Sequence, residues 1–385
     1  MKDRGCRPFM IKRWVFGWGV LLTLALVTSV WGDVNAWLPV STPIRVAVGM
    51  RPDGNYARLS LAVIQRRDHE VRWFDGLQLW TLSMLEPTAL EIDAAGHLWV
   101  GDASLNALFK FTRTPEGLQW TCYDTKNQVD RPVALAFVGS KTFVLDQANG
   151  TVWVFGPSMP LRPLLTGLNN PTALYLVPSN TRLEPPWWIG PPIRRQAGMN
   201  RSNNEFQQPS SGNDSPAFAG GDHANLMDLY VTDMGQATAF STNKPVIRVY
   251  RTDLNGVTLL RSLGEGMLEF PSALDMDRFG RLIVLDAHLA KILVFDPLTG
   301  ALLNEAGRYG PPPNGWRLPL DFAKYKGFRL IADTGNDRLV LRQEMGWGYP
   351  AVFLRMRQRL MRSETGSNPD PEPMVRIHSC EGGTS

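Results

Sequence analysis

Aspartate recurs at one position in five separate stretches of the chain, and no other residue that could do chemistry is spaced so regularly. Each of these aspartates directly follows a short apolar run; the five are Asp102, Asp146, Asp233, Asp286 and Asp333. A ring of carboxylates could bind a cation. A carboxylate at the end of a strand also accepts N–H bonds from the turn that follows it. Because every stretch carries this residue, we expect it to stabilise the turn, and we look for function where the stretches differ.

The stretches differ most in the residues that precede a proline at the start of each. From these positions we take seven candidate ligand-binding residues: Glu86, Asp130, Arg131, Asn170, Phe270, Trp316 and Arg317. Side chains of both charges together with two aromatic rings suit a small polar ligand or a peptide. The same residues could also form an ordinary solvated loop, and the sequence leaves both interpretations open.

The parts that catalysis needs are missing from the sequence. The five histidines, His69, His97, His223, His288 and His378, show no metal-ligand spacing such as His-x-x-x-His. The chain contains neither a Cys-x-x-Cys pair nor a Gly-x-Ser-x-Gly nucleophile elbow. Only His288 falls in a loop that we expect to face a channel. The sequence therefore favours a binding protein over an enzyme.

The elements that must position these residues are strands in a repeated unit. The clearest unit has three apolar runs separated by turn residues: Pro271–Asp277, Gly280–Asp286 and Ile292–Phe295. A fourth run follows each unit, and the units begin at residues 87, 132, 171, 271 and 319. The long third interval contains an insertion between Val177 and Asn225. Four-stranded units of roughly 40–50 residues predict the blades of a β-propeller.

The residues before position 87 supply four more candidate strands and therefore a sixth blade. These runs are Ile44–Gly49, Leu59–Ile64, Val71–Phe74 and Leu77–Leu82. We predict an all-β fold, a six-bladed propeller of four-stranded antiparallel blades over residues 37–345. An N-terminal strand should pair with the last blade and close the ring, which removes an exposed sheet edge. The loops before the prolines would then surround one mouth of the central channel.

The unit Pro-x-Ala-Leu, Gly-x-Leu-x-Val-x-Asp, Ile-x-Val-Phe resembles the NHL repeat, over roughly residues 87–342. NHL propellers include extracellular sensor domains, RNA- and protein-binding domains and a few enzymes, so the resemblance implies architecture more than activity. Two enzymatic relatives, the peptidylglycine amidating lyases and the gluconolactonase-like propellers, bind metal at defined repeat positions. Here those positions hold Thr88, Val133, Thr172, Ser272 and Leu320, and Asn106, Gly150, Ala237, Ala290 and Asp337. Only Asp321 and Asp337 remain as weak candidates for a lone calcium or zinc site.

The N-terminus predicts export. A basic stretch ending at Lys12 and Arg13 precedes an uncharged run from Trp14 to Trp31, and Val34–Ala36 resembles a signal-peptidase site. Residues 1–36 are therefore a cleaved signal peptide or an uncleaved signal-anchor helix, since eighteen residues reach the lower limit for a membrane span. In both cases the positive flank leaves the propeller outside the cytoplasm, in the periplasm, at the cell exterior or attached to the membrane.

The charge balance argues against a nucleic-acid partner. Apolar residues make up 44% of the chain, which provides a core, and the formal net charge is +4. The first 36 residues carry +3 and the last 35 carry +1, so the body between them is neutral. The basic isoelectric point thus belongs to the two ends, and we expect no nucleic-acid binding.

The three cysteines and two atypical segments complete the prediction. Cys6 lies in the leader, while Cys122 and Cys380 form a bridge or remain two unrelated thiols. The insertion 178–225 is polar and rich in proline and glycine, so we expect a disordered excursion, inert or lid-like. The tail 346–385 should be flexible after a short basic stretch, Leu354–Arg362.

Together these observations predict an exported, monomeric NHL-type propeller that needs no cofactor. Its partner would be a protein, a peptide or an envelope glycan bound at the channel mouth, as expected of a scaffold or sensor. The alternative is a metal-dependent propeller enzyme, either lactonase-like or lyase-like. Metal analysis of the purified ectodomain would distinguish the binding protein from the metal-dependent enzyme.

Overall fold

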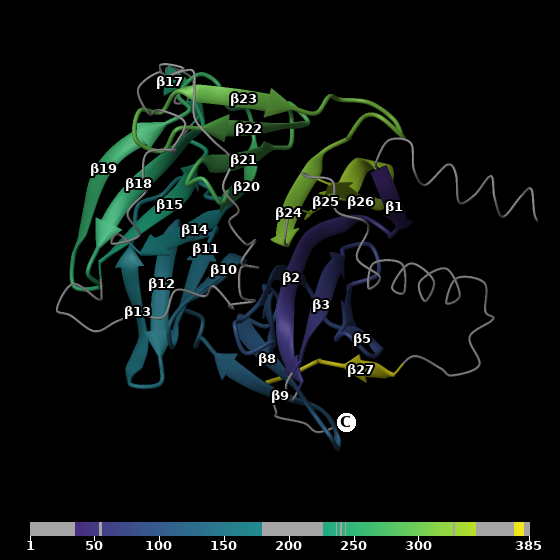
Figure 1. Cartoon of the computed structure of the whole chain (residues 1–385). Coiled ribbons are helices and arrows are strands. Elements are labelled where there is room, and N and C mark those ends of the chain that lie inside the picture. The colour runs from purple at the N-terminus through teal and green to yellow at the C-terminus, as the bar shows by residue number, and fades with distance from the viewer. Residues whose placement is uncertain are drawn as a thin grey trace, which may run out of the picture.

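The computed structural model describes residues 35–53, 56–178, 226–235, 237–238, 241–242, 244–325, 328–343 and 373–380. Within these residues the strands form six large antiparallel sheets arranged as the blades of a propeller (Figure 1). The predicted fold class, an all-β six-bladed propeller with four-stranded blades, is confirmed. The predicted leader helix lies in residues 1–34, outside the described residues.

Blades 1 to 5 are meanders of strands in chain order, counted from the channel outward, and blade 6 takes its outermost strand from the N-terminal side of the chain. Blade 1 contains β2 (Pro43–Asp53), β3 (Tyr56–Gln65), β4 (Glu70–Phe74) and β5 (Leu79–Ser83). Blade 2 contains β6 (Pro87–Ile92), β7 (Leu98–Asp102), β8 (Ala107–Thr114) and β9 (Gly117–Asp124). Blade 3 contains β10 (Pro132–Val138), β11 (Lys141–Asp146), β12 (Thr151–Gly156) and β13 (Met159–Leu165).

The second half of the ring repeats this arrangement. Blade 4 contains β14 (Leu174–Pro178), β15 (Met227–Asp233), β18 (Val246–Thr252) and β19 (Val257–Leu263), with the short hairpin β16 (Ala237–Thr238) and β17 (Ser241–Thr242) before β18. Blade 5 contains β20 (Pro271–Met276), β21 (Leu282–Asp286), β22 (Lys291–Phe295) and β23 (Leu302–Ala306). Blade 6 contains β24 (Pro319–Tyr325), β25 (Phe328–Asp333), β26 (Arg338–Gln343) and β1 (Asn35–Pro39), with the one-turn 3-10 helix η2 (Thr334–Asn336) after β25.

The hydrophobic core is divided among the interfaces between blades. Six clusters of buried side chains form, one between each pair of neighbouring blades around the ring. The second strand of a blade packs against neighbours on both of its faces, so every described residue of β7, β21 and β25 is buried. Because both faces of these strands are buried, their sequences are continuous apolar runs without alternating polar residues.

The ring closes through β1, as predicted. This strand pairs antiparallel with β26, with Asn35 opposite Arg342 and Pro39 opposite Arg338. Because pairing already begins at Asn35, the propeller starts two residues before the expected boundary at residue 37. Closure gives the last blade its fourth strand from the other end of the chain and covers the outer edge of β26.

The two faces of the propeller are distinguished by strand direction. Every inner strand begins at one face, which we call the proline face because Pro87, Pro132, Pro271 and Pro319 begin strands there. Inner strands end at the other face, which we call the opposite face. Since β1 is antiparallel to β26, it enters at the opposite face and ends at the proline face.

The tail differs from its prediction. The strand β27 (Met374–Arg376) pairs parallel with β5 and adds a fifth strand to blade 1 (Figure 1). Val375 and Ile377 are buried against blades 1 and 2, and a Cys122–Cys380 disulfide joins the tail to β9. Residues 373–380 are therefore part of the propeller and not a flexible tail, because two apolar side chains and a bridge hold them. Of the predicted insertion 178–225, Pro178 ends β14 and residues 179–225 lie outside the described residues.

In the part of the chain that the structure describes, no helix has the length and apolar character needed to cross a membrane. The predicted anchor, residues 14–31, falls outside that part.

Candidate functional site

The five repeated aspartates stabilise loops, as expected. Each is almost completely buried, and the carboxylate of Asp286 accepts N–H bonds from His288 and Leu289 in the turn that follows it. The same carboxylate also accepts the N–H groups of Glu269 and Phe270, in the loop that enters the blade. One aspartate therefore fixes two loops at the proline face.

This second set of bonds holds the backbone of the candidate binding residues. The N–H of Glu86 donates to Asp102 at 2.9 Å, that of Arg131 to Asp146 at 3.0 Å, and that of Arg317 to Asp333 at 2.7 Å. Blade 4 is different, since Asp233 accepts from Gly235 and from the Arg248 side chain. In four blades a buried carboxylate thus fixes the main chain while the side chain there varies freely.

Three of the predicted residues meet in a pocket at the proline face. Glu86, Arg131 and Phe270, from different blades, line a cavity of about 360 Å³ together with Arg66 and His69. Arg131 Nη2 lies 3.5 Å from Glu86 Oε1, and both side chains are about two-fifths exposed. The Phe270 ring packs on His288 with 5.0 Å between ring centroids. The pocket therefore offers an ion pair and an aromatic face to a ligand.

The other predicted residues do not line this pocket. Asp130 and Asn170 are exposed, and Asp130 accepts a hydrogen bond from the Asn149 amide. Arg317 is also exposed. Trp316 is only 6% exposed and packs in the core between blades 5 and 6, with Arg342 over its ring. The prediction that Trp316 lies at the channel mouth and binds a ligand is therefore wrong, because its indole fills the space between two blades.

Arg45 crosses the channel beneath this pocket, and the sequence analysis missed it. Its guanidinium, from blade 1, donates to the carbonyls of Val133, Thr172 and Leu320, on blades 3, 4 and 6, at 3.0, 3.4 and 3.3 Å. Burial lowers the pKa of Arg45, while Asp321 nearby opposes that shift. Because Arg45 lines the pockets at both ends, its side chain divides the channel.

The pocket on the other side of Arg45 is acidic. It has a volume of about 390 Å³, and its charged lining residues besides Arg45 are Glu91, Asp93, Asp275, Asp321 and Lys324. Burial, together with smaller contributions from the carboxylates of Asp321 and Asp275, raises the pKa of Glu91 to about 8, against the lowering effect of the hydrogen bond from the Ile92 N–H. Burial also raises the pKa of Asp321 to about 6, against the lowering effect of Arg45. Lys324 Nζ donates to the Met276 carbonyl at 3.0 Å.

The positions that would hold metal in enzymatic propellers have other roles here. The hydroxyls of Thr88, Thr172 and Ser272 each donate to the carbonyl of the proline that begins the next blade. Asp321 accepts the Val46 N–H at 2.9 Å, and Asp337 accepts the Thr42 N–H at 2.8 Å. Among the described residues, no three His, Cys, Asp or Glu side chains form a group that could hold a metal ion.

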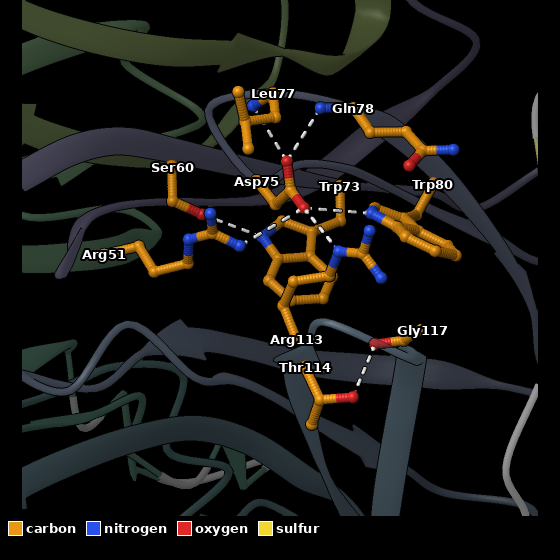
Figure 2. A network of polar contacts seen from close by, with 10 residues as sticks. All are labelled: Arg51, Ser60, Trp73, Asp75, Leu77, Gln78, Trp80, Arg113, Thr114 and Gly117. Carbon is orange, nitrogen blue, oxygen red and sulfur yellow. Dashed lines mark hydrogen bonds and ion pairs between the residues drawn. The ribbon is translucent and has the colours of Figure 1, made fainter. Parts of the chain in front are cut away.

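Blade 1 lacks the repeated aspartate and uses a different buried carboxylate. Figure 2 shows Asp75 between Arg51 and Arg113, each with a nitrogen 3.5 Å from its Oδ2 atom. Asp75 Oδ1 accepts the N–H groups of Leu77 and Gln78. Arg113 belongs to β8, so this network joins blade 1 to blade 2 at the opposite face. Its role is structural, and it does not line the channel.

Comparison with known proteins supports the fold. No protein-family model matches the chain, and no curated protein matches it in sequence. A structural-genomics target named as a gluconolactonase candidate has a TM-score of 0.51 and 12% identity, covering 81% of this chain and 92% of that one. Virginiamycin B lyase from Staphylococcus aureus has a TM-score of 0.46 and 10% identity, covering 81% of this chain and 99% of that one. Hydrazine synthase from Kuenenia stuttgartiensis has a TM-score of 0.46 and 10% identity, covering 79% of this chain and 96% of that one. The strand pairing shows that the chain is a six-bladed β-propeller, and the likeness to the gluconolactonase candidate, at 12% identity, is one of fold alone.

Proposed function

We propose that this chain is an exported, NHL-type propeller that acts as a binding module, a scaffold or a sensor. Its ligand is a protein, a peptide or an envelope glycan, bound at the pocket on the proline face. The observation that carries this proposal is the hydrogen bonding of the loop backbones by buried aspartates. A scaffold that holds the main chain rigid while the side chains differ from blade to blade is what a recognition surface requires.

The chemistry of the pocket supports a ligand with polar groups and one flat or apolar face. Arg131 and Glu86 can exchange their mutual contact for hydrogen bonds to a ligand, because an exposed ion pair contributes little stability. Phe270 supplies an aromatic surface against which a sugar ring or a peptide side chain can pack. The proposal requires no metal, cofactor or activated nucleophile.

The test uses the full chain, immobilised in detergent and probed with a peptide library and an array of envelope glycans. Arg131→Ala and Phe270→Ala should each weaken binding of the selected ligands at least tenfold. Arg278→Ala removes an exposed arginine from the opposite face and is the matched control, which should bind normally. Undiminished binding by both folded pocket variants would contradict the proposal.

The alternative, a metal-dependent propeller enzyme, has its own test. Metal analysis after dialysis would detect stoichiometric zinc or calcium, and Asp321→Ala or Asp337→Ala would abolish it. That result would favour the enzyme over the binding module.

A further inference from the structure

A further cavity lies between blades 2 and 3, outside the channel, and we call it the inter-blade crevice. It has a volume of about 540 Å³, with β7–β9 on one side and β11–β13 on the other. Among the residues that the structure describes, its lining includes none from the inner strands β6 and β10 and none from the pocket on the proline face. Its volume falls within the range of about 300–1,000 Å³ that small-ligand sites occupy.

Aromatic rings form one wall of the crevice. The rings of Trp99 and Tyr123 in blade 2 stack with 5.1 Å between centroids, and the ring of Phe155 in blade 3 lies 5.5 Å from that of Tyr123. Trp99 is held in place because its Nε1 donates to the Asp93 carboxylate at 2.9 Å. Trp99 is buried, whereas Tyr123 and Phe155 are partly exposed. This wall is therefore a pre-positioned surface against which a flat, apolar face of a ligand can pack.

Thr142 places a hydroxyl in the crevice at a repeat position where three other blades have leucine. Four residues before the repeated aspartate, blades 2, 4 and 5 have Leu98, Leu229 and Leu282, each completely buried against the preceding blade. Thr142 is 5% exposed and lines the crevice, and its hydroxyl has no hydrogen-bond partner in the described part of the chain. A ligand that bonds this hydroxyl would remove the cost of leaving it buried and unpaired.

Two more polar groups of the crevice form no hydrogen bond or ion pair with any described residue. The ammonium of Lys110 lies over the Trp99 ring, 5.4 Å from its centroid, and the second group is the hydroxyl of Tyr123. Burial, with a smaller contribution from the Asp93 carboxylate, raises the pKa of Tyr123, so its hydroxyl keeps a proton to donate at neutral pH. The crevice thus combines an aromatic wall with three unpaired polar groups.

This combination favours one class of ligand. A wholly apolar ligand would leave the Thr142 hydroxyl and the Lys110 ammonium without partners. An extended peptide is a poor fit as an added strand, because Pro160 and Pro163 in β13 have no N–H group to pair. A sugar ring has an apolar C–H face together with a rim of hydroxyls that both donate and accept. It therefore matches the aromatic wall and the polar groups at once.

We propose that the inter-blade crevice binds one pyranose unit of a glycan. The rings of Tyr123 and Phe155 pack against the C–H face of the sugar, and Thr142 and Lys110 bond its oxygen atoms. This site is separate from the pocket on the proline face, and it does not depend on which ligand binds there.

The experiment is saturation-transfer NMR on the full chain in detergent. The probes are the methyl pyranosides of glucose, galactose, mannose, N-acetylglucosamine and glucuronic acid, titrated into the millimolar range. Tyr123→Ala removes the ring, Tyr123→Phe removes only its hydroxyl, and Thr142→Val removes the buried hydroxyl while keeping the shape. Thr258→Val is the matched control, since Thr258 is an exposed threonine on β19 of blade 4.

At least one pyranoside should bind, with an affinity that Tyr123→Ala lowers about tenfold and that Thr142→Val and Tyr123→Phe each lower about threefold. Thr258→Val, Arg131→Ala and Phe270→Ala should leave this affinity unchanged. No signal from any of the five probes, or binding that Tyr123→Phe and Thr142→Val both leave intact, would overturn the proposal. Pyranoside binding lost only in Arg131→Ala or Phe270→Ala would also overturn it, while supporting the proposed function of the proline-face pocket.

Discussion

The hydroxyl of Thr334 donates a hydrogen bond to the carbonyl of Pro43, 291 residues earlier in the chain. Thr88, Thr172 and Ser272 make the same kind of bond from one blade to the next. Blade 6 has Leu320 at the equivalent position, so its hydroxyl comes from the loop after β25 instead. The hydrogen bond from Thr334 therefore joins blade 6 to blade 1, at the place where the ring closes.

Replacing Thr334 with valine should lower the free energy of unfolding by about 1–2 kcal/mol, because a buried carbonyl loses its donor while the shape is kept. Urea denaturation of the full chain measures the change. Thr166→Val alters an exposed threonine and should stay within roughly 0.5 kcal/mol of the wild type. Equal effects of the two substitutions would show that the Thr334 bond adds nothing to closure.

Glu91→Gln should stabilise the protein at pH 8 and have little effect at pH 5. The raised pKa of Glu91, about 8, means that the folded state keeps a proton that the unfolded state releases above its ordinary value near 4.5. The folded wild type therefore loses stability as pH rises between these two values, and a neutral amide avoids that loss. At about 1.4 kcal/mol per unit of pKa shift, the gain at pH 8 should be at least ~1 kcal/mol.

Thermal unfolding of Glu91→Gln and wild type, from pH 5 to pH 9, measures this difference. A melting temperature below that of the wild type at pH 8 would show that the carboxylate is not destabilised by its surroundings.

Asp286→Asn should destabilise the fold by about 2–3 kcal/mol and loosen the loop that presents Phe270. The carboxylate accepts four backbone N–H groups, and hydrogen bonds to charged acceptors are stronger than neutral ones. Asp296→Asn is the matched control, since Asp296 accepts two N–H groups in an exposed turn. Hydrogen exchange at the Phe270 amide should accelerate in the first variant only.

Removing the bridge with Cys122→Ser and Cys380→Ser should cost about 2–4 kcal/mol and free β27 from blade 1. Only three residues of β27 pair with β5, so the strand depends on the bridge and on the burial of Val375 and Ile377. Hydrogen exchange at residues 374–377 should increase strongly. Cys6→Ser retains the bridge and should leave exchange in this region unchanged.

The architecture could be predicted from the sequence, because the strands and turns of a propeller blade lie close together along the chain. The apolar periodicity of four strands and the aspartates of their turns all fall within about 45 residues of sequence. Five copies of this pattern in the chain made the repeat recognisable. The role of Asp286 could be inferred for the same reason, since its partners lie in turns close by. The sixth blade was predicted from the four strand-like runs before residue 87, and the closing N-terminal strand from the need to cover sheet edges.

The residues at the centre and at the edges of the ring could be identified only from the folded structure. Arg45 binds carbonyls on three other blades, and its neighbours are brought together by ring closure rather than by any spacing in the sequence. Trp316 resembled a mouth residue in sequence, yet the gap between two blades buries it. The bridge between Cys122 and Cys380 spans 258 residues, and nothing in either local sequence distinguishes a pair from two free thiols. Each of these outcomes depends on residues that meet only when the ring has closed.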